Sequence, residues 1–223
     1  MTKNNNIHLP YESLLTPDDH EEIAGKSNTV KYANKDIIFK QDTRTSHIMF
    51  VNTGLVKIYK EGQNGRNHIL KLAQKKDFIG LMSIMGGEIF QYSASAIGEV
   101  EVSFVDNHVF RNILLRNGKY SIQVMKTISA EGLYIFDKLL NQAQKQLPGR
   151  IADVILYFSN VIYESDHFTF PLTRKELAEL AGTTKESFIR TLTEFKNDKI
   201  IELDGSNVKI MSSKIIKTLS ELG

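Results

Sequence analysis

The stretch KDFIGLMSIMGGEIFQYSASA, residues 76–96, combines residue types that could hold a phosphate group. Its glycines would let a ligand approach the backbone closely, and its serines can donate hydrogen bonds. No lysine or arginine follows Asp77 in this stretch, although an anion in an apolar pocket needs a charged or well-placed donor. The stretch therefore resembles a ligand-binding loop, but it lacks the positive charge that a nucleotide phosphate requires.

Cysteine and histidine usage limits the other chemistry. The chain has no cysteine, which excludes disulfides, thiolate zinc sites, cysteine nucleophiles and cysteine-held iron–sulfur clusters. Its histidines form no close pair with metal-ligand spacing, and it has no Walker loop or nucleophile-elbow motif. We therefore expect no catalytic residue and no metal site, with a metal-dependent β-roll enzyme as the remote alternative. The histidines are His8, His20, His47, His68, His108 and His167.

The segment LTRKELAELAGTTKESFIRTLTEFKNDKII has the pattern of two short helices joined by a tight turn. Thr173 and Glu176 form a capping box that begins the first helix, and Gly182 is suited to end it. A threonine after the glycine, Thr183 or Thr184, then caps the second helix. This order predicts a helix-turn-helix, a motif whose second helix can enter the major groove of DNA.

The second helix of this motif has two different sides. Its apolar side holds Phe188, Leu192 and Phe195, whereas Lys185, Glu186, Ile189 and Arg190 lie on the other side. The hairpin IIELDGSNVKI follows as the wing of a winged helix. The alternative is an ordinary αα-hairpin with a charged outer face, because acidic residues slightly outnumber basic ones after residue 150.

Four segments position these residues. Residues 10–26 predict a short helical segment, and residues 29–106 predict many short strands separated by turns, which favours an all-β roll or barrel. Residues 119–146 have helical spacing and no proline. Pro148-Gly149 then marks the best domain boundary. Within the roll, the predicted strands include DIIF, HIMFV, LVKIY, HILKL, DFIGL and VEVSFV, with turns at Asn52–Gly54 and a hairpin at Asn64-Gly65.

The long helix is apolar on two adjacent faces, and such a helix must bury both. One face can cover the roll, and a second copy of the same helix is the simplest partner for the other. The alternative is a helix buried within one subunit. The first stripe, which has the spacing of a coiled-coil seam, contains Met125, Ile128, Gly132, Ile135 and Leu139. The second contains Ile122, Met125, Leu133, Phe136, Leu140 and Ala143.

Composition is that of an ordinary globular chain. Its 223 residues fit one large or two small domains. A net charge of +2 does not indicate a particular class of binding partner. The first residues, MTKNNNIHLP, lack the apolar core of a signal peptide, and no run of about 18 apolar residues occurs. We therefore expect a cytoplasmic protein without a membrane span.

The order of these segments resembles the CRP/FNR superfamily of bacterial transcription regulators over nearly the whole chain. The landmarks are DFIG in the roll, GRIA within PGRIADVIL at the start of the second domain, and the helix-turn-helix. The resemblance implies an α+β chain with a cyclic-nucleotide-binding-like jelly roll (double-stranded β-helix), a long dimerisation helix and a winged helix-turn-helix. The expected domains are residues 1–147, with the dimerisation helix at about 109–146, and residues 148–223.

The resemblance also implies the partners. Family members are homodimers that bind two-fold symmetric double-stranded DNA and act with RNA polymerase. A glutamate and an arginine of the family's recognition helix read bases in TGA-containing half-sites, and Glu186 and Arg190 match those positions. Arginine can donate two bonds to guanine, and a carboxylate can accept from cytosine. The expected DNA-binding residues are Arg174, Thr184, Lys185, Glu186, Ile189 and Arg190.

The resemblance does not identify an effector. In relatives that bind cyclic nucleotides, a glutamate and an arginine after DFIG hold the ligand, but Leu81 and Gln91 occupy these positions here. We therefore expect neither cyclic AMP nor an iron–sulfur cluster. A different small-molecule effector, haem, or no effector at all remain as alternatives. A hinge near residues 144–149 would transmit the signal. The candidate pocket contains Phe78, Ile79, Gly80, Leu81, Met82, Gln91, Tyr92, Ser93 and Phe136.

Overall fold

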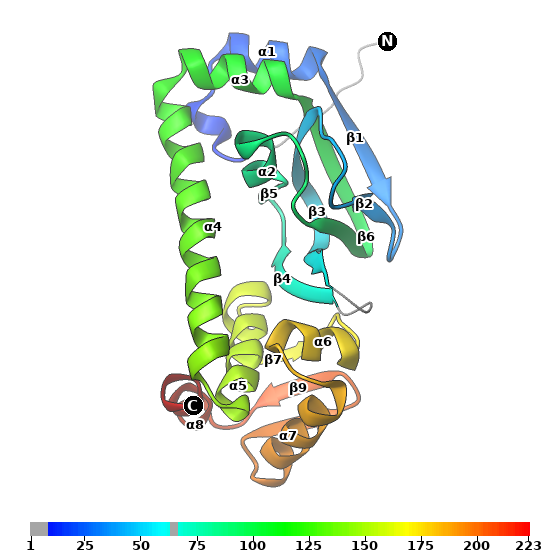
Figure 1. Cartoon of the computed structure of the whole chain (residues 1–223), viewed down its shortest axis with the longest axis vertical. Coiled ribbons are helices and arrows are strands. Elements are labelled where there is room, and N and C mark those ends of the chain that lie inside the picture. Colours follow the sequence, from blue (N-terminus) through cyan, green and yellow to red (C-terminus); the bar gives the residue numbers. More distant parts are fainter. Residues whose placement is uncertain (1–8, 63–66) are drawn as a thin grey trace. The chain divides into compact units, whose positions relative to one another are not determined.

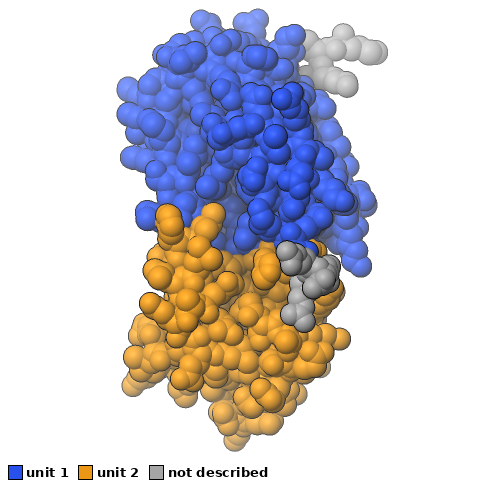
Figure 2. All heavy atoms as spheres, in the orientation of Figure 1, with its two compact units in different colours: residues 1–63, 70–134 blue, residues 64–69, 135–223 orange. Residues whose placement is uncertain are grey.

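The computed structural model describes residues 9–62 and 67–223. The chain forms two compact units (Figure 2): residues 1–63 and 70–134 make unit 1, and residues 64–69 and 135–223 make unit 2. The division falls within α4 (Gly118–Gln144), so that one long helix contributes to both units. The predicted hairpin at Asn64-Gly65 lies outside the described residues.

Unit 1 is built on a six-stranded antiparallel sheet with the order β1-β6-β3-β4, in which β2 also pairs with β6 and β5 with β3. Helices α1 and α3 lie side by side at one end of this sheet (Figure 1). The fold confirms the predicted N-terminal β-roll domain. Its elements are η1 (Glu12–Leu14), α1 (Pro17–Gly25), β1 (Ser27–Tyr32), β2 (Ile37–Phe39), β3 (His47–Glu61), β4 (Asn67–Ala73, whose residues 67–69 are grouped with unit 2), β5 (Phe78–Ile79), α2 (Leu81–Gly86), β6 (Ser93–Asp106) and α3 (Asn107–Arg116).

The two central strands are longer than the turn signals predict. HIMFV and LVKIY belong to one 15-residue strand, β3, because the predicted turn at Asn52–Gly54 is an irregularity within the ladder. The register to β6 shifts on both sides of Thr53, and Gly54 has a φ of 85°. A bulge keeps the strand paired while bending it, so that a glycine at this place does not end the element.

The predicted strand DFIGL is only partly a strand. Phe78 and Ile79 pair with β3, but Gly80 has a φ of 81° and is the N-cap residue of α2. The left-handed conformation at Gly80 turns the chain from strand to helix, and a side chain there would also collide with the ring of Phe90. The glycine therefore places α2 directly against the sheet.

The predicted dimerisation helix of residues 109–146 is two helices. Asn117 separates α3 from α4, and its side-chain Oδ1 accepts a hydrogen bond of 3.1 Å from the main-chain nitrogen of Tyr120. Its amide also donates to the carbonyl of Leu14 at 2.8 Å. An asparagine competes for backbone hydrogen bonds in this way, which explains why the helix restarts here.

A buried carboxylate holds α1 against this junction. Asp19 is 1% exposed and accepts hydrogen bonds from Arg116 Nε at 2.8 Å and Arg116 Nη2 at 2.6 Å. Burial alone would raise the pKa of Asp19, but hydrogen bonds from the Thr16 main chain, Arg116 and Asn117 outweigh it and lower the pKa to about 2. The charged carboxylate is therefore the form that the fold stabilises.

We expect Asp19→Asn to lower the free energy of unfolding by about 2 kcal/mol at pH 7. Because the folded pKa lies below the unfolded value, the carboxylate's contribution is present above about pH 4 and is lost as the pH falls toward 2. Denaturant unfolding at several pH values measures this effect, with Asp18→Asn, an exposed neighbour, as the control. Equal losses in the two variants would contradict the assigned role of Asp19.

Unit 2 combines helices with a three-stranded antiparallel sheet of order β7-β9-β8. The structure confirms the predicted C-terminal winged helix-turn-helix, including the hairpin about Asp204-Gly205. None of the helices in the described part of the chain has the length and apolar character needed to cross a membrane. The elements of unit 2 that follow α4 are α5 (Leu147–Tyr157), the π-helix η3 (Phe158–Ile162), β7 (His167–Thr169), α6 (Arg174–Ala181), α7 (Lys185–Asn197), β8 (Ile201–Asp204), β9 (Asn207–Ile210) and α8 (Ser213–Leu222).

Candidate functional site

The helix-turn-helix is formed by α6 and α7, and local sequence explains both of its helices. Thr173 and Glu176 make the predicted capping box at the start of α6. Gly182 ends the helix with a φ of 65°, a conformation that glycine adopts without steric cost. Thr184, and not Thr183, is the N-cap of α7, and its hydroxyl accepts from the main-chain nitrogen of Ser187 at 3.2 Å.

The position of this cap leaves Glu186 outside the capping of α7. Because Thr184 is the cap, the third residue of the helix is Ser187, and Glu186 lies one position earlier with its side chain exposed. A carboxylate in the first turn also interacts favourably with the helix dipole. Glu186 is therefore available to an outside partner.

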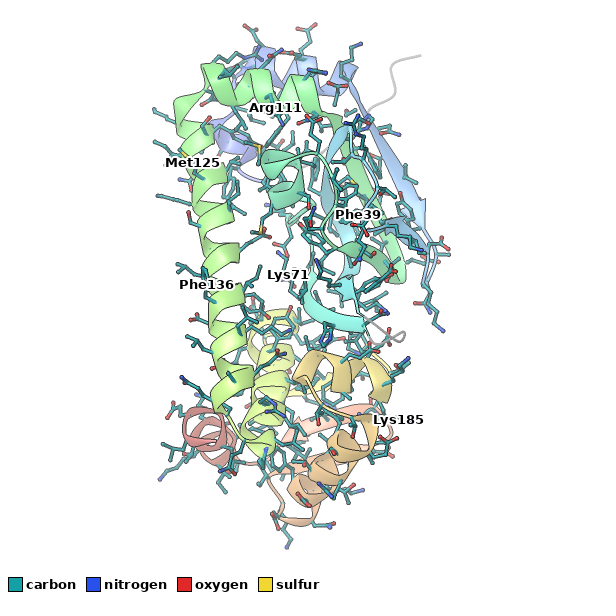
Figure 3. The ribbon with its side chains drawn as sticks, in the orientation of Figure 1. Phe39, Lys71, Arg111, Met125, Phe136 and Lys185 are labelled. Carbon is teal, nitrogen blue, oxygen red and sulfur yellow. The ribbon has the colours of Figure 1, made fainter. Side chains whose placement is uncertain are left out.

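The two sides of α7 differ as the sequence predicts. Phe188, Leu192 and Phe195 are buried in the unit, together with Thr191, which is only 3% exposed. The opposite side is exposed and carries one lysine, one glutamate, one isoleucine and one arginine. Figure 3 labels the lysine, Lys185, at the start of the helix. These residues are Lys185, Glu186, Ile189 and Arg190.

Arg174 is separated from this group by its own contacts. Its Nη2 donates to the main-chain carbonyl of Gly205 in the turn of the wing, and its guanidinium lies 5.6 Å from the ring centroid of Phe170. Burial lowers the pKa of Arg174. The structure therefore uses Arg174 to hold the wing against α6, a role that sequence reasoning did not identify.

The loop that resembles a phosphate site is largely part of the core. Phe78, Ile79 and Leu81 are each at most 2% exposed, and they belong to the two apolar clusters of unit 1. The rings of Phe39 and Phe90 stack at a centroid distance of 3.9 Å beside them. These predicted pocket residues therefore fill the roll with their own side chains.

The polar residues of the predicted pocket have partners within the roll. Ser93 Oγ accepts from the main-chain nitrogen of Gln41 and donates to Glu61, at 2.9 Å in each case. Gln91 is exposed and receives a hydrogen bond from Lys60 at its main-chain carbonyl. Met82 is partly buried on α2. The cationic group among these contacts is the Lys60 ammonium, which lies 3.1 Å from the Gln91 carbonyl oxygen.

Tyr92 connects this loop to α4. Burial raises the pKa of Tyr92, as does the charge of Glu131, while hydrogen bonds with Ser83 and with the main chain at Gly80 oppose the shift. Glu131 of α4 in turn forms an ion pair with Lys71 of β4. The ion pair of Glu131 with Lys71 therefore links α4 to β4, and the charge of Glu131 acts on the phenol of Tyr92.

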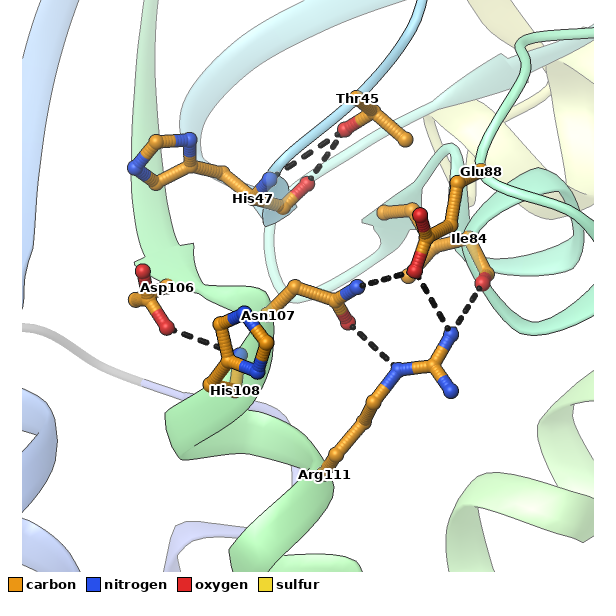
Figure 4. A network of polar contacts seen from close by, with 8 residues as sticks. All are labelled: Thr45, His47, Ile84, Glu88, Asp106, Asn107, His108 and Arg111. Carbon is orange, nitrogen blue, oxygen red and sulfur yellow. Dashed lines mark hydrogen bonds and ion pairs between the residues drawn. The ribbon is translucent and has the colours of Figure 1, made fainter.

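A second polar network links α3 to the loop after α2 (Figure 4). Arg111 donates to the carbonyl of Ile84 at 3.1 Å, to Asn107 at 3.3 Å and to Glu88 at 3.4 Å. The guanidinium of Arg111 is thus satisfied by protein groups. Among residues 9–62 and 67–223, no three His, Asp or Glu side chains gather in a way that could hold a metal ion.

One side of α4 is apolar and exposed. Figure 3 labels two residues of this side, Met125 and Phe136. The side chain of Phe136 is 66% exposed. Phe136 belongs to unit 2, and the other predicted pocket residues belong to unit 1. Ile128 packs against the core of unit 1, and Gly132 and Ile135 are partly buried. The exposed stripe consists of Ile122, Met125, Leu133, Phe136, Leu139 and Leu140.

Two further residues were missed by sequence reasoning. Arg150, within the GRIA landmark, donates to two main-chain carbonyls of other segments. Lys138 donates to the carbonyl of Ile69 at 2.7 Å, and burial lowers its pKa to about 7. No local sequence signal marks either residue, because their partners are backbone atoms outside their own helices.

Family models match both parts of the chain. The cyclic nucleotide-binding domain matches residues 29–117, and the Crp-like helix-turn-helix domain matches residues 149–214. The chain is 23% identical to the transcriptional activatory protein AadR of Rhodopseudomonas palustris, covering 92% of this chain and 87% of that protein. It is 22% identical to the anaerobic regulatory protein of Bacillus subtilis, covering 90% and 87%.

Solved structures show the same fold. FixK2 from Bradyrhizobium japonicum matches with a TM-score of 0.80 and 20% identity, over 86% of this chain and 96% of that one. A transcriptional regulator of the CRP/FNR family from Eubacterium rectale matches with a TM-score of 0.78 and 18% identity, over 96% and 98%. With both domain models, these relatives and the helix-turn-helix geometry in agreement, the chain belongs to the CRP/FNR family of transcription regulators.

Proposed function

We propose that the chain binds, as a homodimer, a two-fold symmetric DNA site with TGA-type half-sites, and so regulates transcription with RNA polymerase in the cytoplasm. The observation that carries this proposal is the exposed side of α7. Its four side chains lie at the start of the second helix of a helix-turn-helix, the part that meets base edges in this class of protein.

The side chains of α7 suit two different kinds of DNA contact. Arg190 can donate two parallel bonds to a guanine, and Glu186, four residues earlier on the same side, can accept from a cytosine amino group. Lys185 and the cap residue Thr184 lie at the helix N-terminus, which suits phosphate oxygens. Contacts of the first kind select a sequence, and contacts of the second kind set the position of the protein on the DNA.

The exposed stripe of α4 supports the homodimer. Six large apolar side chains on one side of a single helix, including Leu133 at 64% and Phe136 at 66% exposure, form an apolar surface of the kind that marks an interface. Their separations of three, four and eight residues keep them on one side of the helix, as in a helix that packs along another helix. Two copies of α4 would cover both stripes at once, because a two-fold axis places the same surface on each side.

Fluorescence anisotropy with labelled DNA tests the proposed function. We expect the chain to bind a duplex with two inverted TGA half-sites more tightly than a scrambled duplex of the same length and composition. Specific binding of this class exceeds non-specific binding by roughly a thousandfold or more. Equal affinities for the whole series of inverted half-site duplexes and for the scrambled duplex would refute the proposal.

Two residues of the roll argue against a cyclic nucleotide as the effector. Leu81 stands fully buried where an acid would hold the ribose, and Gln91 is exposed where a base would hold the phosphate. We expect no thermal shift on adding cyclic AMP at about 1 mM, whereas a micromolar ligand at that concentration would stabilise the fold by about 4 kcal/mol. A clear upward shift of the melting temperature would contradict this expectation, and a Soret band in the purified protein would favour the haem alternative.

A further inference from the structure

We infer that Arg150 is a positioning residue that fixes the turn of the helix-turn-helix to the C-terminal end of α4, and thereby sets the half-site spacing that the dimer accepts. The inference rests on the proposed function, because spacing has meaning only for a dimer that reads two half-sites. All the groups involved lie in unit 2.

The guanidinium of Arg150 bridges two helix ends. Its Nε donates to the carbonyl of Ala181, the last residue of α6, at 3.1 Å. Its Nη1 donates to the carbonyl of Lys145, just after the end of α4, at 3.0 Å. The last carbonyls of a helix lack partners within the helix, and a cation is also favoured there by the helix dipole. One planar side chain therefore ties α5, α6 and the end of α4 together.

A second contact joins the same two segments. Gln142 of α4 lies against the turn glycine: a Cβ atom at Gly182 would be 2.9 Å from Nε2 of Gln142. The left-handed conformation of Gly182, with a φ of 65°, already favours glycine at this place. The absence of a side chain at Gly182 additionally lets the turn pack closely on α4.

The end of α4 is held on its other side as well. Lys145 Nζ lies 2.8 Å from both carboxylate oxygens of Asp153 in α5, and Ser220 of α8 donates to the same carboxylate at 2.5 Å. Pro148 and Gly149 had indicated a hinge at residues 144–149. The contacts of Arg150 and Lys145 tie this segment to α5 and α6.

The contacts of Arg150 affect which spacing between the two half-sites the dimer can bind. If paired α4 helices determine where each helix-turn-helix begins, then Arg150 determines the separation and angle of the two copies of α7. One additional base pair between half-sites shifts the second half-site by about 3.4 Å and rotates it by about 34°. A rigid dimer should therefore accept one spacing and reject its neighbours, whereas a loosened dimer should accept several.

The test uses the full-length chain and a series of duplexes in which the spacer between inverted TGA half-sites changes by single base pairs. For the wild-type chain we expect one optimal spacer, with affinity falling about tenfold or more at a change of one base pair. Arg150→Ala should reduce this ratio to about threefold or less, while its affinity for a duplex with one half-site stays close to that of the wild type. Arg150→Lys should behave similarly, since a lysine keeps the charge but lacks the planar fork.

Arg111→Ala is the matched control, because Arg111 also donates to a main-chain carbonyl but lies in unit 1. We expect it to keep the wild-type ratio between the optimal spacer and its neighbours. Hydrogen exchange without DNA gives a second measurement: Arg150→Ala should speed exchange of the amides at residues 182–186, and Arg111→Ala should not. An Arg150→Ala variant with the wild-type ratio, or with unchanged exchange in that turn, would overturn the inference. Failure of the wild-type chain to prefer any inverted duplex would refute the proposed function instead, and the exchange measurement would still decide the role of Arg150.

Discussion

Arg190→Ala should remove about 1–3 kcal/mol of discrimination at one guanine in each TGA half-site. Arg190 is exposed on the side of α7 that also carries Glu186, whereas the guanidinium of Arg174 is bound to the wing turn. A symmetric dimer would lose one arginine–guanine pair in each half-site, which makes this the largest expected change from one substitution in the DNA interface. Anisotropy titrations against the half-site duplex and four single-base variants measure the discrimination directly.

Lys185→Ala provides the matched control for Arg190→Ala. Lys185 is equally exposed on the same helix, but its position at the N-terminus suits a phosphate. Its removal should weaken binding to specific and scrambled duplexes alike, and should make the slope of log K against log salt shallower by about 0.9 for each phosphate that is no longer neutralised. If Arg190→Ala also lowered affinity equally for all sequences, the assignment of Arg190 to a base would be wrong.

Phe136→Glu should convert the dimer to a monomer at micromolar concentration. Phe136 is the most exposed side chain of the α4 stripe, and two copies would place two carboxylates in an apolar interface. An unpaired buried charge costs about 3–5 kcal/mol, which raises the dimer dissociation constant at least a hundredfold. Sedimentation equilibrium measures the dissociation constant, and circular dichroism verifies that the helix content is unchanged.

Ala130→Glu adds the same charge to an exposed position of α4 outside the stripe. Ala130 precedes Phe136 by six positions, which places it about 120° around the helix. The dimer should tolerate this change with little loss of affinity. A Phe136→Glu variant that remained as dimeric as Ala130→Glu would show that the exposed stripe is not the dimer interface.

Local sequence predicted the elements that depend on neighbouring residues. The capping box of Thr173 and Glu176 and the left-handed Gly182 fix α6 within a few positions, and the three- and four-residue steps of α7 separate its buried side from its exposed side. Such signals act over one or two helical turns, so they survive any change in tertiary context.

Features that depend on long-range pairing could not be predicted in the same way. The turn signal at Asn52–Gly54 is a bulge because β6 pairs with β3 on both sides of it. Arg174 has the charge of a DNA contact, and its Nη2 also donates to the carbonyl of Gly205 in the wing turn. Ile128 has the spacing of the seam, yet it packs against the core of unit 1. In each case the deciding partner is far away in the sequence.

The candidate pocket also depends on contacts that local sequence does not predict. Leu81 and Gln91 stand where relatives that bind cyclic nucleotides carry charged residues, and the expectation that this loop does not hold a nucleotide phosphate stays a prediction for the thermal-shift measurement. The sequence did not show that Phe78 and Ile79 belong to the core, or that the charge of Glu131 in α4 acts on Tyr92. These contacts exist only when the loop, the sheet and the long helix are folded together.

The most direct test of the account is the binding stoichiometry and sequence preference of the full-length chain on DNA. Sedimentation velocity with a labelled duplex that carries two inverted TGA half-sites should show two chains per duplex, and a scrambled duplex should compete at least about a hundredfold less well. One chain per duplex, or equal competition by the scrambled DNA across the spacer series, would contradict the account.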